Sequence, residues 1–473
     1  MNRILGCFVL LIVALASMAF PQDHQPATNQ EARAIFKQLI EINTTESVGS
    51  VTKAADAMAQ RLRDAGFSDQ DLIVAGPNER KENLVVRLRG TGQKPPILFI
   101  GHLDVVEARR EDWSMDPFKF IEQDGNFYGR GTRDMKAGDA ILVMSFLRLK
   151  REGYKPDRDL IVALTADEEA GDFNGIDWLA KQHRDWIDAQ YCINLDGGEF
   201  ERVRGQRGLA GLQASEKVYE DFQFETTSPG GHSSIPGPDN AIYELAAALG
   251  KLSKYSFPVR TSEITRGYFA QSAKFVSGPL AADLRSAAEN PPNPSAIQHL
   301  STIPYYNSLL RTTCVATMLS GGHAPNALPQ SARANVNCRI FPGEEPEEVL
   351  KTLQRVVDDP NVKVTPVAEK TSDGKPIPVV AVPPSPLQPE LTKALETTLA
   401  TMWTGMEVVP TMSTGATDGK YLRIAGIPTF GIACMFFDME DDRSHGKDER
   451  VGVQDFYDGV EFGYRFMKTL STN

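Results

Sequence analysis

Side chains that could bind metal ions follow three strand-like runs of this chain. The apolar runs over residues 96–101, 160–165 and 191–195 are typical of buried strands. In an open, mostly parallel sheet, ligands bind beyond the carboxyl ends of the strands. The imidazole and carboxylate groups that follow these runs are His102, Asp104, Glu168, Glu169 and Asp196. We therefore expect these groups to meet at one edge of a sheet.

The types and spacing of these residues suit a metal site that includes a proton-transfer group. His102 and Asp104 are two residues apart, so both lie on one side of an extended backbone. The Asp104 carboxylate could then accept a hydrogen bond from the second ring nitrogen of His102 and fix its tautomer, as is typical of metal-bound imidazole. In the adjacent pair Glu168 and Glu169, one carboxylate could bind a metal and the other could transfer a proton.

Two further candidates lie in other segments. Asp134 ends a turn punctuated by glycines ahead of a predicted helix, and His445 follows a late strand-like run. The turn is not a phosphate-binding loop, because it matches neither G-x-x-x-x-G-K-S/T nor G-x-G-x-x-G. The chain also contains no G-x-S-x-G and no H-E-x-x-H. These absences exclude a serine hydrolase with a nucleophile elbow and a single-zinc protease of the H-E-x-x-H type.

The elements that carry these residues predict an α/β domain. Helical periodicity at residues 31–42 and 52–65 is followed by β-rich runs at 72–74, 83–88 and 96–101. Helices then alternate with the strands that carry the candidate ligands. This alternation is typical of a mixed, mostly parallel sheet that is flanked by helices.

The pattern changes near residue 214. Six runs predict the order βαββαβ of a ferredoxin-like α+β domain: residues 219–227, 240–254, 312–320, 332–341, 346–357 and 362–367. A Pro-rich and helical stretch at 257–306 interrupts this order.

The final segments return to the first domain. A Pro-rich stretch over residues 375–389 predicts a linker, and two helices and a strand follow it, at residues 390–403, 453–470 and 429–434 respectively. We therefore expect a larger domain, formed by 29–213 and 375–473, into which a smaller domain over 214–374 is inserted.

The net charge and the N-terminal segment of the chain indicate its partners and its location. The 473 residues carry a net charge of −12, and a nucleic-acid partner is not expected because phosphate binding needs a basic surface.

The apolar run over residues 4–20 follows Arg3 and contains small-residue cleavage sites, so residues 1–20 predict a signal peptide and a secreted or periplasmic protein. The alternative is a short membrane anchor. The run is shorter than the ~20 residues of a spanning helix, so we expect no stable membrane association.

The cysteines do not form a disulfide framework. Cys314 and Cys338 lie in two strand-like runs that could be neighbours, so one bridge could form. Buried free thiols are the preferred interpretation.

Six motifs resemble those of one enzyme family. They are GHLDVV at 101–106, W-x-x-x-P-F at 113–118, YGRGTRDMKAG at 128–138, ADEEAG at 166–171, GGHSSIPGPDNA at 230–241 and HGKDER at 445–450. Together they resemble the two-zinc amidohydrolase family that contains glutamate carboxypeptidase, carboxypeptidase S, aminoacylase, acetylornithine deacetylase and the carnosine dipeptidases. The resemblance covers residues 31–467. It implies a zinc-exopeptidase-like catalytic domain with an inserted lid and dimerisation domain.

The resemblance also implies a role for each candidate. His102 and Asp196 would bind one metal, Glu169 and His445 the other, and Asp134 would bridge both. Glu168 would be the general base, and Asp104 would orient His102. The expected cofactors are two divalent ions, zinc foremost, with cobalt or manganese as alternatives.

Further roles concern the substrate. His232 would stabilise the oxyanion, usually from the partner subunit of a homodimer formed through the inserted domain. Arg339 would bind the substrate carboxylate, and Asn326 would lie near the oxyanion. Gly415, with Thr414 and Asp418, resembles the loop that closes the substrate end of the cleft.

The expected function is an exported metallopeptidase that acts as a carboxypeptidase or dipeptidase. The insertion at 257–306 enlarges the lid as in carboxypeptidase S-like members, which favours cleavage beside a free C-terminal carboxylate. An N-acyl-amino-acid deacylase with the same mechanism is the alternative. An inactive binding protein is a remote third alternative. All five expected ligands and Glu168 are present, which argues against the loss of activity.

Overall fold

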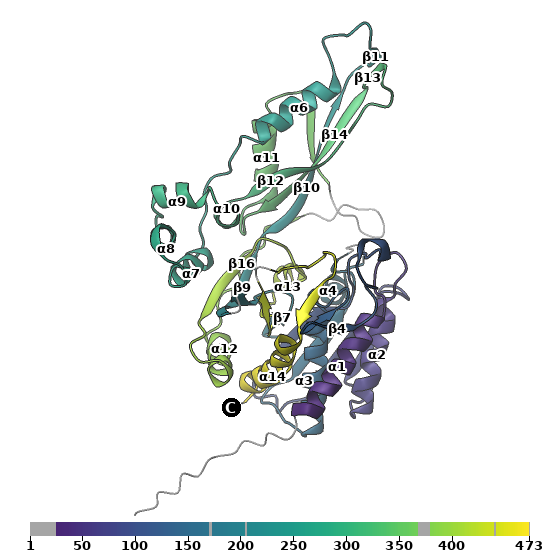
Figure 1. Ribbon diagram of the computed structural model, residues 1–473, viewed down its shortest axis with the longest axis vertical. Coiled ribbons are helices and arrows are strands. Elements are labelled where there is room, and N and C mark those ends of the chain that lie inside the picture. The colour runs from purple at the N-terminus through teal and green to yellow at the C-terminus, as the bar shows by residue number, and fades with distance from the viewer. Residues whose placement is uncertain (1–24, 170–172, 204–205, 368–378, 439–440, 473) are drawn as a thin grey trace, which may run out of the picture.

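The computed structural model describes residues 25–169, 173–203, 206–367, 379–438 and 441–472, which form two sheet-based units (Figure 1). Among these residues, the larger sheet has ten strands in the order β1-β2-β6-β3-β7-β17-β9-β8-β18, with β16 paired to β9. Its centre is parallel, because β3 pairs in parallel with both β6 and β7, and β7 pairs in parallel with β17. The predicted mixed, mostly parallel α/β sheet is confirmed.

The strands of the larger sheet have the following bounds: β1 Leu72–Ala75, β2 Asn83–Leu88, β3 Ile97–His102, β6 Leu160–Thr165, β7 Tyr191–Asn194, β8 Phe200–Val203, β9 Gln206–Glu216, β16 Val408–Ser413, β17 Thr429–Gly431 and β18 Phe436–Asp438. A small antiparallel sheet beside it contains β4 Ile121–Gln123, β5 Asn126–Tyr128 and β19 Arg450–Gly452. A short 3-10 helix, Arg110–Asp112, precedes this small sheet.

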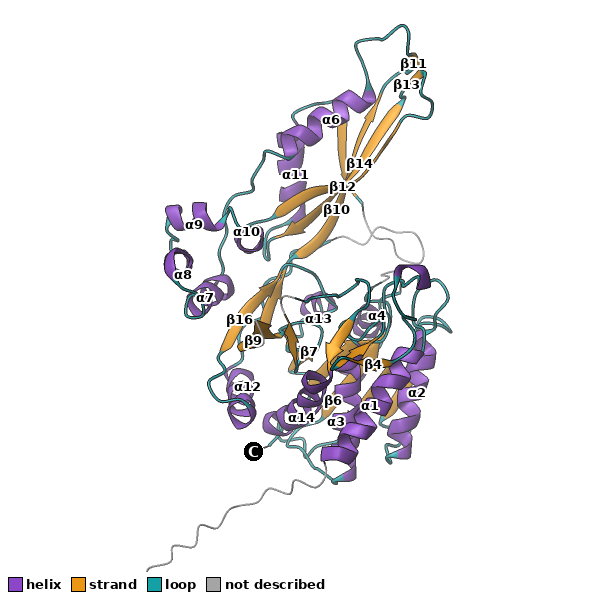
Figure 2. Cartoon of the chain, in the orientation of Figure 1, coloured by secondary structure: helices purple, strands orange, loops and turns teal. Residues whose placement is uncertain are grey.

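Helices cover both faces of the larger sheet (Figure 2). One face packs against α1 Gln25–Glu41, α2 Val51–Asp64, α3 Lys136–Arg151, α12 Pro389–Met402 and α14 Val453–Leu470. The other packs against α4 Gly175–Gln182, α5 Arg184–Ile187 and α13 Gly419–Ile424.

The two faces of the central strands explain their continuous apolar runs. Along β3, Ile97 and Phe99 belong to the core beneath α3, whereas Leu98 and Ile100 belong to the core beneath α4. Because both faces are buried, the strand shows no alternation of polar and apolar residues. This burial also makes the strand ends rigid supports for the side chains that follow them.

The smaller unit contains a four-stranded antiparallel sheet in the order β12-β14-β10-β15. Its elements are β10 Val218–Thr227, α6 Ala241–Leu252, β12 Thr313–Gly321, β14 Ser331–Ile340, α11 Pro346–Val357 and β15 Val362–Pro366. This is the predicted order βαββαβ, and α6 and α11 cover one face. A two-stranded ladder, β11 Gly231–His232 and β13 Ala327–Leu328, forms the far end of this unit (Figure 1).

The helices of the 257–306 stretch pack against a different unit from the one expected. They are α7 Glu263–Ser272, α8 Gly278–Ala287, α9 Pro294–Leu300 and α10 Pro304–Leu310. Their buried side chains, such as Phe269 and Leu284, join the core of the larger sheet, and α7 packs against β16. The insertion therefore extends the larger unit and does not enlarge the lid, because its apolar faces meet the strand that carries Pro410.

The expectation of free thiols at Cys314 and Cys338 was wrong. Cys314 on β12 lies directly opposite Cys338 on β14, and the two form a disulfide. The other two described cysteines, Cys192 and Cys434, are buried and free.

The predicted signal peptide lies outside the described residues. Within the described part of the chain, no helix is both long enough and apolar enough to cross a membrane.

Candidate metal centre

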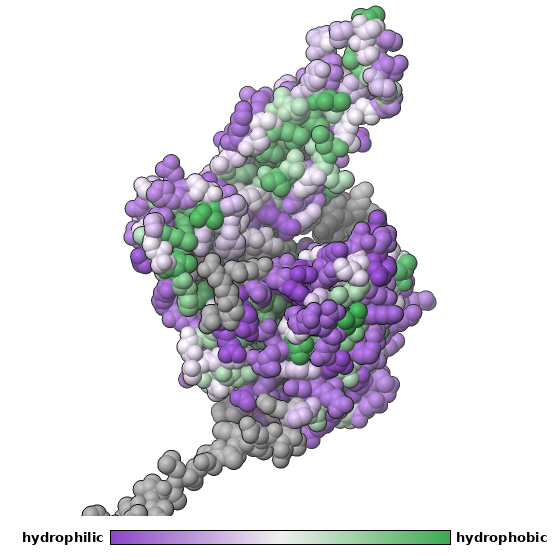
Figure 3. Space-filling view, in the orientation of Figure 1, coloured by the Kyte–Doolittle hydropathy of each residue, from purple (hydrophilic) through white to green (hydrophobic). Residues whose placement is uncertain are grey.

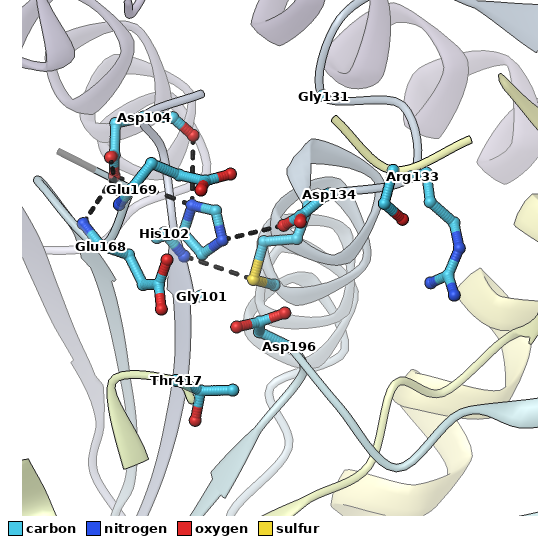
Figure 4. Close-up of polar contacts among 12 residues, drawn as sticks. Gly101, His102, Asp104, Gly131, Arg133, Asp134, Glu168, Glu169, Asp196 and Thr417 are labelled. Carbon is cyan, nitrogen blue, oxygen red and sulfur yellow. Dashed lines mark hydrogen bonds and ion pairs between the residues drawn. The ribbon is translucent and has the colours of Figure 1, made fainter. Parts of the chain in front are cut away.

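The carboxyl ends of three adjacent strands bring the predicted ligands together (Figure 4). His102 is the last residue of β3, Glu168 and Glu169 follow β6, and Asp196 follows β7. Because β6, β3 and β7 are neighbours in the sheet, these residues emerge side by side. Asp134 comes from the turn before α3, and His445 from the loop before β19.

These side chains form overlapping groups whose ligand atoms lie within 4.8 Å of one another. One group contains His102, Asp134 and Asp196, and another contains Asp134, Glu169 and His445. Asp134 belongs to both. Its Oδ1 lies 3.1 Å from Nε2 of His102, and its Oδ2 lies 3.1 Å from Nε2 of His445. Nε2 of His445 also lies 2.9 Å from Oε1 of Glu169.

The charges of this cluster suit divalent cations. Burial, and then the charge of Asp134, raise the pKa of Asp196 well above its ordinary value. Hydrogen bonds to Asp134 and Glu169 raise the pKa of His445 to about 10. Several carboxylates that face one another in a buried place are stabilised by a bound dication, and each of the two groups supplies three ligand atoms, as a catalytic zinc requires. The donor set therefore fits two such ions.

Glu168 lies beside the ligands in a third group with His102 and Glu169. Burial raises the pKa of Glu168 well above the usual value of a glutamate, and the charges of Asp196 and Asp418 raise it further while His102 lowers it. A carboxylate with a raised pKa is a more effective proton acceptor near neutral pH.

The contact between Asp104 and His102 uses a different group of Asp104 from the one predicted. Nδ1 of His102 lies 3.1 Å from the backbone carbonyl oxygen of Asp104, whereas the nearest carboxylate oxygen is 3.7 Å away, too far for a hydrogen bond. The carboxylate instead accepts hydrogen bonds from the backbone N–H groups of Glu168 and Glu169, at 3.2 and 2.9 Å. Asp104 thus orients His102 through its backbone and holds the loop of both glutamates through its side chain.

Two buried acids beside the cluster were not singled out from the sequence. Asp167, which precedes Glu168, forms a buried ion pair with Lys81 and has a positive φ of 62°. Glu449 accepts hydrogen bonds from the turn that carries Asp134. Both lie within the motifs ADEEAG and HGKDER, but an acidic residue in a loop carries no sequence signal of burial.

A cleft of about 390 Å³ connects the glutamates to the smaller sheet. Glu168, Glu169, Asp418 and Lys420 line it on the side of the larger unit, and Arg339 lines it from β14. The Arg339 guanidinium lies over the ring of Tyr219, 4.6 Å from its centroid. A second cleft of about 210 Å³ adjoins Asp134, Glu169 and His445.

Gly415 lies in the loop that borders both clefts. Its N–H donates to Oγ of Ser413, at 3.0 Å, and Ala416 and Thr417 of the same loop line the clefts. Ser413, on the other side of Gly415 in the chain, also lines one cleft, and closure of the substrate end by this loop stays a prediction.

His232 and Asn326 are not near the metal cluster of the same chain. They lie at the far end of the smaller unit, where His232 on β11 is exposed and the N–H of Ser233 donates to the carbonyl oxygen of Asn326 (Figure 1). Nδ1 of His232 lies 2.7 Å from Oγ of Ser234.

Sequence comparison gives a family for this chain. A family model described as peptidase family M20/M25/M40 matches residues 98–469. The probable carboxypeptidase S-like 2 of Dictyostelium discoideum is 28% identical over 408 residues, covering 82% of this chain and 74% of that protein. The human N-fatty-acyl-amino acid synthase/hydrolase PM20D1 is 26% identical over 400 residues, covering 80% and 74%.

Structural comparison gives the same fold. The M20 family metallo-carboxypeptidase Sso-CP2 of Sulfolobus solfataricus matches with a TM-score of 0.68 and 15% identity, covering 93% of this chain and 99% of that one. The YXEP protein of Bacillus subtilis, described as a dinuclear metal binding peptidase, matches with a TM-score of 0.58 and 11% identity, covering 94% and 98%. The chain therefore belongs to peptidase family M20/M25/M40, a family of metallopeptidases with dinuclear metal sites.

Proposed function

We propose that this protein is an exported exopeptidase that uses two metal ions to hydrolyse the amide bond next to a free C-terminal carboxylate. The observation that carries the proposal is the cluster at the strand ends, which opens into a cleft with Arg339 on its opposite wall. Glu168 and Glu169 line this cleft from the larger unit, and Arg339 lines it from the smaller unit.

The ligand assignment follows the two groups of side chains. His102 and Asp196 would hold one ion, Glu169 and His445 the other, and Asp134 would contact both. Three protein ligands would leave a coordination position open on each ion. Two bound divalent ions would lower the pKa of a water molecule and polarise the scissile carbonyl. Zinc is the proposed metal, and cobalt or manganese also suit these ligands.

Glu168 acts as the general base of this mechanism. Its side chain forms no ion pair with any residue in the described segments, so its carboxylate remains free to accept a proton from the attacking water. Glu168 then passes this proton to the leaving amine. Asp104 keeps the backbone of Glu168 in place during both steps.

Arg339 binds the carboxylate of the substrate. Its planar guanidinium can make two parallel hydrogen bonds to a carboxylate. Oδ1 of Asn337 accepts from Nε of Arg339 at 3.3 Å, and Tyr219 supports its flat face, which leaves the outer N–H groups for a ligand. The loop that contains Gly415 closes the neighbouring wall.

A second candidate function is N-acyl-amino-acid hydrolysis. It is favoured by the relatives whose names describe N-fatty-acyl-amino acid synthase/hydrolase activity. The chemistry at the cluster is the same for both functions, because a fatty amide and a peptide bond present the same carbonyl to water. The two functions differ only in the group on the acyl side of that bond.

In this proposal residues 214–374 are inserted between 29–213 and 375–473, and the smaller unit within this insertion serves as a lid and dimerisation domain. Helices α7–α10 belong to the same insertion but pack on the larger unit. The edge strand β12 exposes Val315, Met318 and Leu319, and α6 exposes Tyr243 nearby. Figure 3 shows hydrophobic surface over this unit. An exposed apolar edge strand can pair with the same strand of a second copy. His232 and Asn326 would then reach the cleft of the partner, where His232 would stabilise the oxyanion.

The test is a substrate panel on protein without residues 1–20, the proposed signal peptide. The panel contains dipeptides, N-acetyl and N-fatty-acyl amino acids, and the same compounds with an amidated carboxyl end. We expect hydrolysis that stops on chelation, returns with zinc or manganese, and needs the free carboxylate. A preference for long acyl chains would select the second function. The absence of turnover after metal is restored would overturn both functions and favour an inactive binding protein.

A further inference from the structure

The buried pair Arg130–Glu449 connects the two loops that carry Asp134 and His445. The Glu449 side chain is fully buried, and Arg130 is 2% exposed. Nη1 of Arg130 donates to Oε2 of Glu449 at 2.5 Å. The two residues are more than 300 positions apart in the chain. They meet because β19 pairs with β5: Glu449 directly precedes β19, and Arg130 lies two residues after Tyr128, the last residue of β5.

The Glu449 carboxylate accepts hydrogen bonds from the backbone of the turn that carries Asp134. Its Oε1 accepts hydrogen bonds from the N–H groups of Arg133 and Asp134, at 2.7 and 3.0 Å. Its Oε2 accepts from the N–H of Gly131 at 3.2 Å as well as from Arg130. A carboxylate offers about four lone-pair sites. The three backbone N–H groups and the Arg130 guanidinium use all four, so the whole carboxylate bonds to the turn that places Asp134 between the two histidines.

Arg130 extends the same support to the other loop. Its Nη2 donates to the carbonyl oxygens of His445 and Gly446, at 3.1 and 3.2 Å. The guanidinium also lies 5.0 Å from the ring centroid of Trp113, which limits its orientation. Neither Arg130 nor Glu449 belongs to the groups of ligand atoms, so the pair acts on the site only through Asp134 and His445.

We infer that Arg130 and Glu449 are positioning residues that hold Asp134 and His445 at the separation required to bind metal. This inference rests on the proposed two-metal function. A buried ion pair on its own adds little net stability, because desolvation offsets the attraction. The hydrogen bonds of this pair instead fix the two segments that carry the shared ligand and a ligand of the second ion. Loss of such outer contacts typically reduces metal affinity by roughly 10- to 100-fold.

The test compares Glu449→Gln and Arg130→Met with wild type and with Asp157→Asn as a control. Asp157 is a buried carboxylate that pairs with Arg158 and Lys94 before the start of β6, at the opposite end of the strand from the site. Zinc affinity of the metal-free proteins is measured by competition with a chromophoric chelator, and the melting temperature of each metal-free protein is recorded.

We expect Glu449→Gln to weaken binding of both ions by roughly 10- to 100-fold, because its amide nitrogen would face N–H donors. Arg130→Met should mainly weaken one ion, since the Asp134 turn keeps its three backbone hydrogen bonds to Glu449. Asp157→Asn should lower the melting temperature but leave zinc affinity unchanged. If Glu449→Gln does not fold, Arg130→Met decides the question.

Wild-type affinity in the two pair variants would overturn the inference, as would an equal loss of affinity in Asp157→Asn. Either result would leave the proposed function intact, because the wild-type chain would still bind two ions. A wild-type chain that binds no metal would overturn the proposed function and this inference together.

Discussion

Glu168 and Glu169 are adjacent in the sequence but have different surroundings. Oε1 of Glu169 lies 2.9 Å from His445, whereas Glu168 faces the cleft, and burial raises its pKa. Two neighbouring carboxylates can therefore have separate roles, one as ligand and one as base.

Replacement of Glu168 by Gln tests this division of roles. The amide cannot accept the proton of the attacking water, so we predict that turnover falls by roughly 10²- to 10⁴-fold. Metal content should not change, because Glu168 is not an assigned ligand. Steady-state kinetics and metal analysis of the same preparation measure both quantities. Turnover close to wild type would show that another group accepts the proton.

Arg339 allows a second prediction at this scale. Arg339→Met retains much of the apolar length of the side chain and removes the fork that would bind a carboxylate. We expect KM for substrates with a free carboxylate to rise by at least about tenfold, the effect of losing roughly 1.4 kcal/mol of a charged hydrogen-bonded contact. Substrates with an amidated carboxyl end are the control, and their weak hydrolysis should not change further. An equal effect on both kinds of substrate would contradict the assignment.

The connection between β9 and β10 is the element that joins the larger sheet to the smaller one. Lys217 lies in this connection, its side chain is buried, and its Nζ donates to Oγ1 of Thr313 at 3.3 Å. Burial and the nearby charge of Arg339 lower the pKa of Lys217 to about 7, while Glu344 opposes the shift.

This lowered pKa predicts how Lys217→Met affects stability. The unfolded lysine keeps an ordinary pKa near 10.4. Between about pH 7 and that value, the unfolded chain binds more protons than the folded chain, so this residue destabilises the fold increasingly as the pH falls. Lys217→Met should therefore raise the melting temperature, and by more at pH 6 than at pH 9. A gain that does not depend on pH would contradict the burial of a neutral amine.

The strands and helices of the larger sheet could be predicted from the sequence because their patterns are local. The run at 160–165 matches β6 and the run at 453–470 matches α14. The packing of α7 against β16 could not be predicted, because an amphipathic helix does not specify which surface its apolar face will meet. The Cys314–Cys338 disulfide depends in the same way on the register of β12 with β14.

His102, Glu169 and Asp196 could be predicted as candidate ligands because they lie at the carboxyl ends of neighbouring strands and so share one edge of the sheet. Asp134 and His445 lie in a turn and a loop, and the motif resemblance indicated them. The side-chain partners of Asp104 and Glu449 depend on loop conformation and were not predictable. Asp104 lies two residues from His102, yet its carboxylate faces the loop after β6. Spacing along a strand gives the side of the backbone but not the donor that a carboxylate meets.

At the scale of the whole molecule, β11, the strand that carries His232, lies far from the metal cluster of its own chain (Figure 1). If two chains associate through the smaller unit, each cleft needs the His232 of its partner. Co-expression of His232→Ala with Glu168→Gln tests this arrangement, since each variant alone would be inactive. A mixed dimer would contain one complete site, so about one quarter of wild-type activity should return when chains pair at random.

The control for this experiment is a mixture of the same two variants, purified separately as dimers and kept well above the concentration at which the dimers dissociate, so that chains do not exchange. Activity restored by co-expression alone would support a shared site. Full activity of His232→Ala by itself, or no recovery on co-expression, would contradict it.

The central claim is that this chain binds two divalent ions through one shared carboxylate, Asp134. The most direct measurement is the metal content per chain of the wild-type protein and of Asp134→Ala, after reconstitution with zinc and removal of excess metal. The account predicts close to two ions in the wild type and close to none in the variant, because Asp134 belongs to both ligand groups. A wild-type chain without bound metal, or an Asp134→Ala variant that retains both ions, would contradict it.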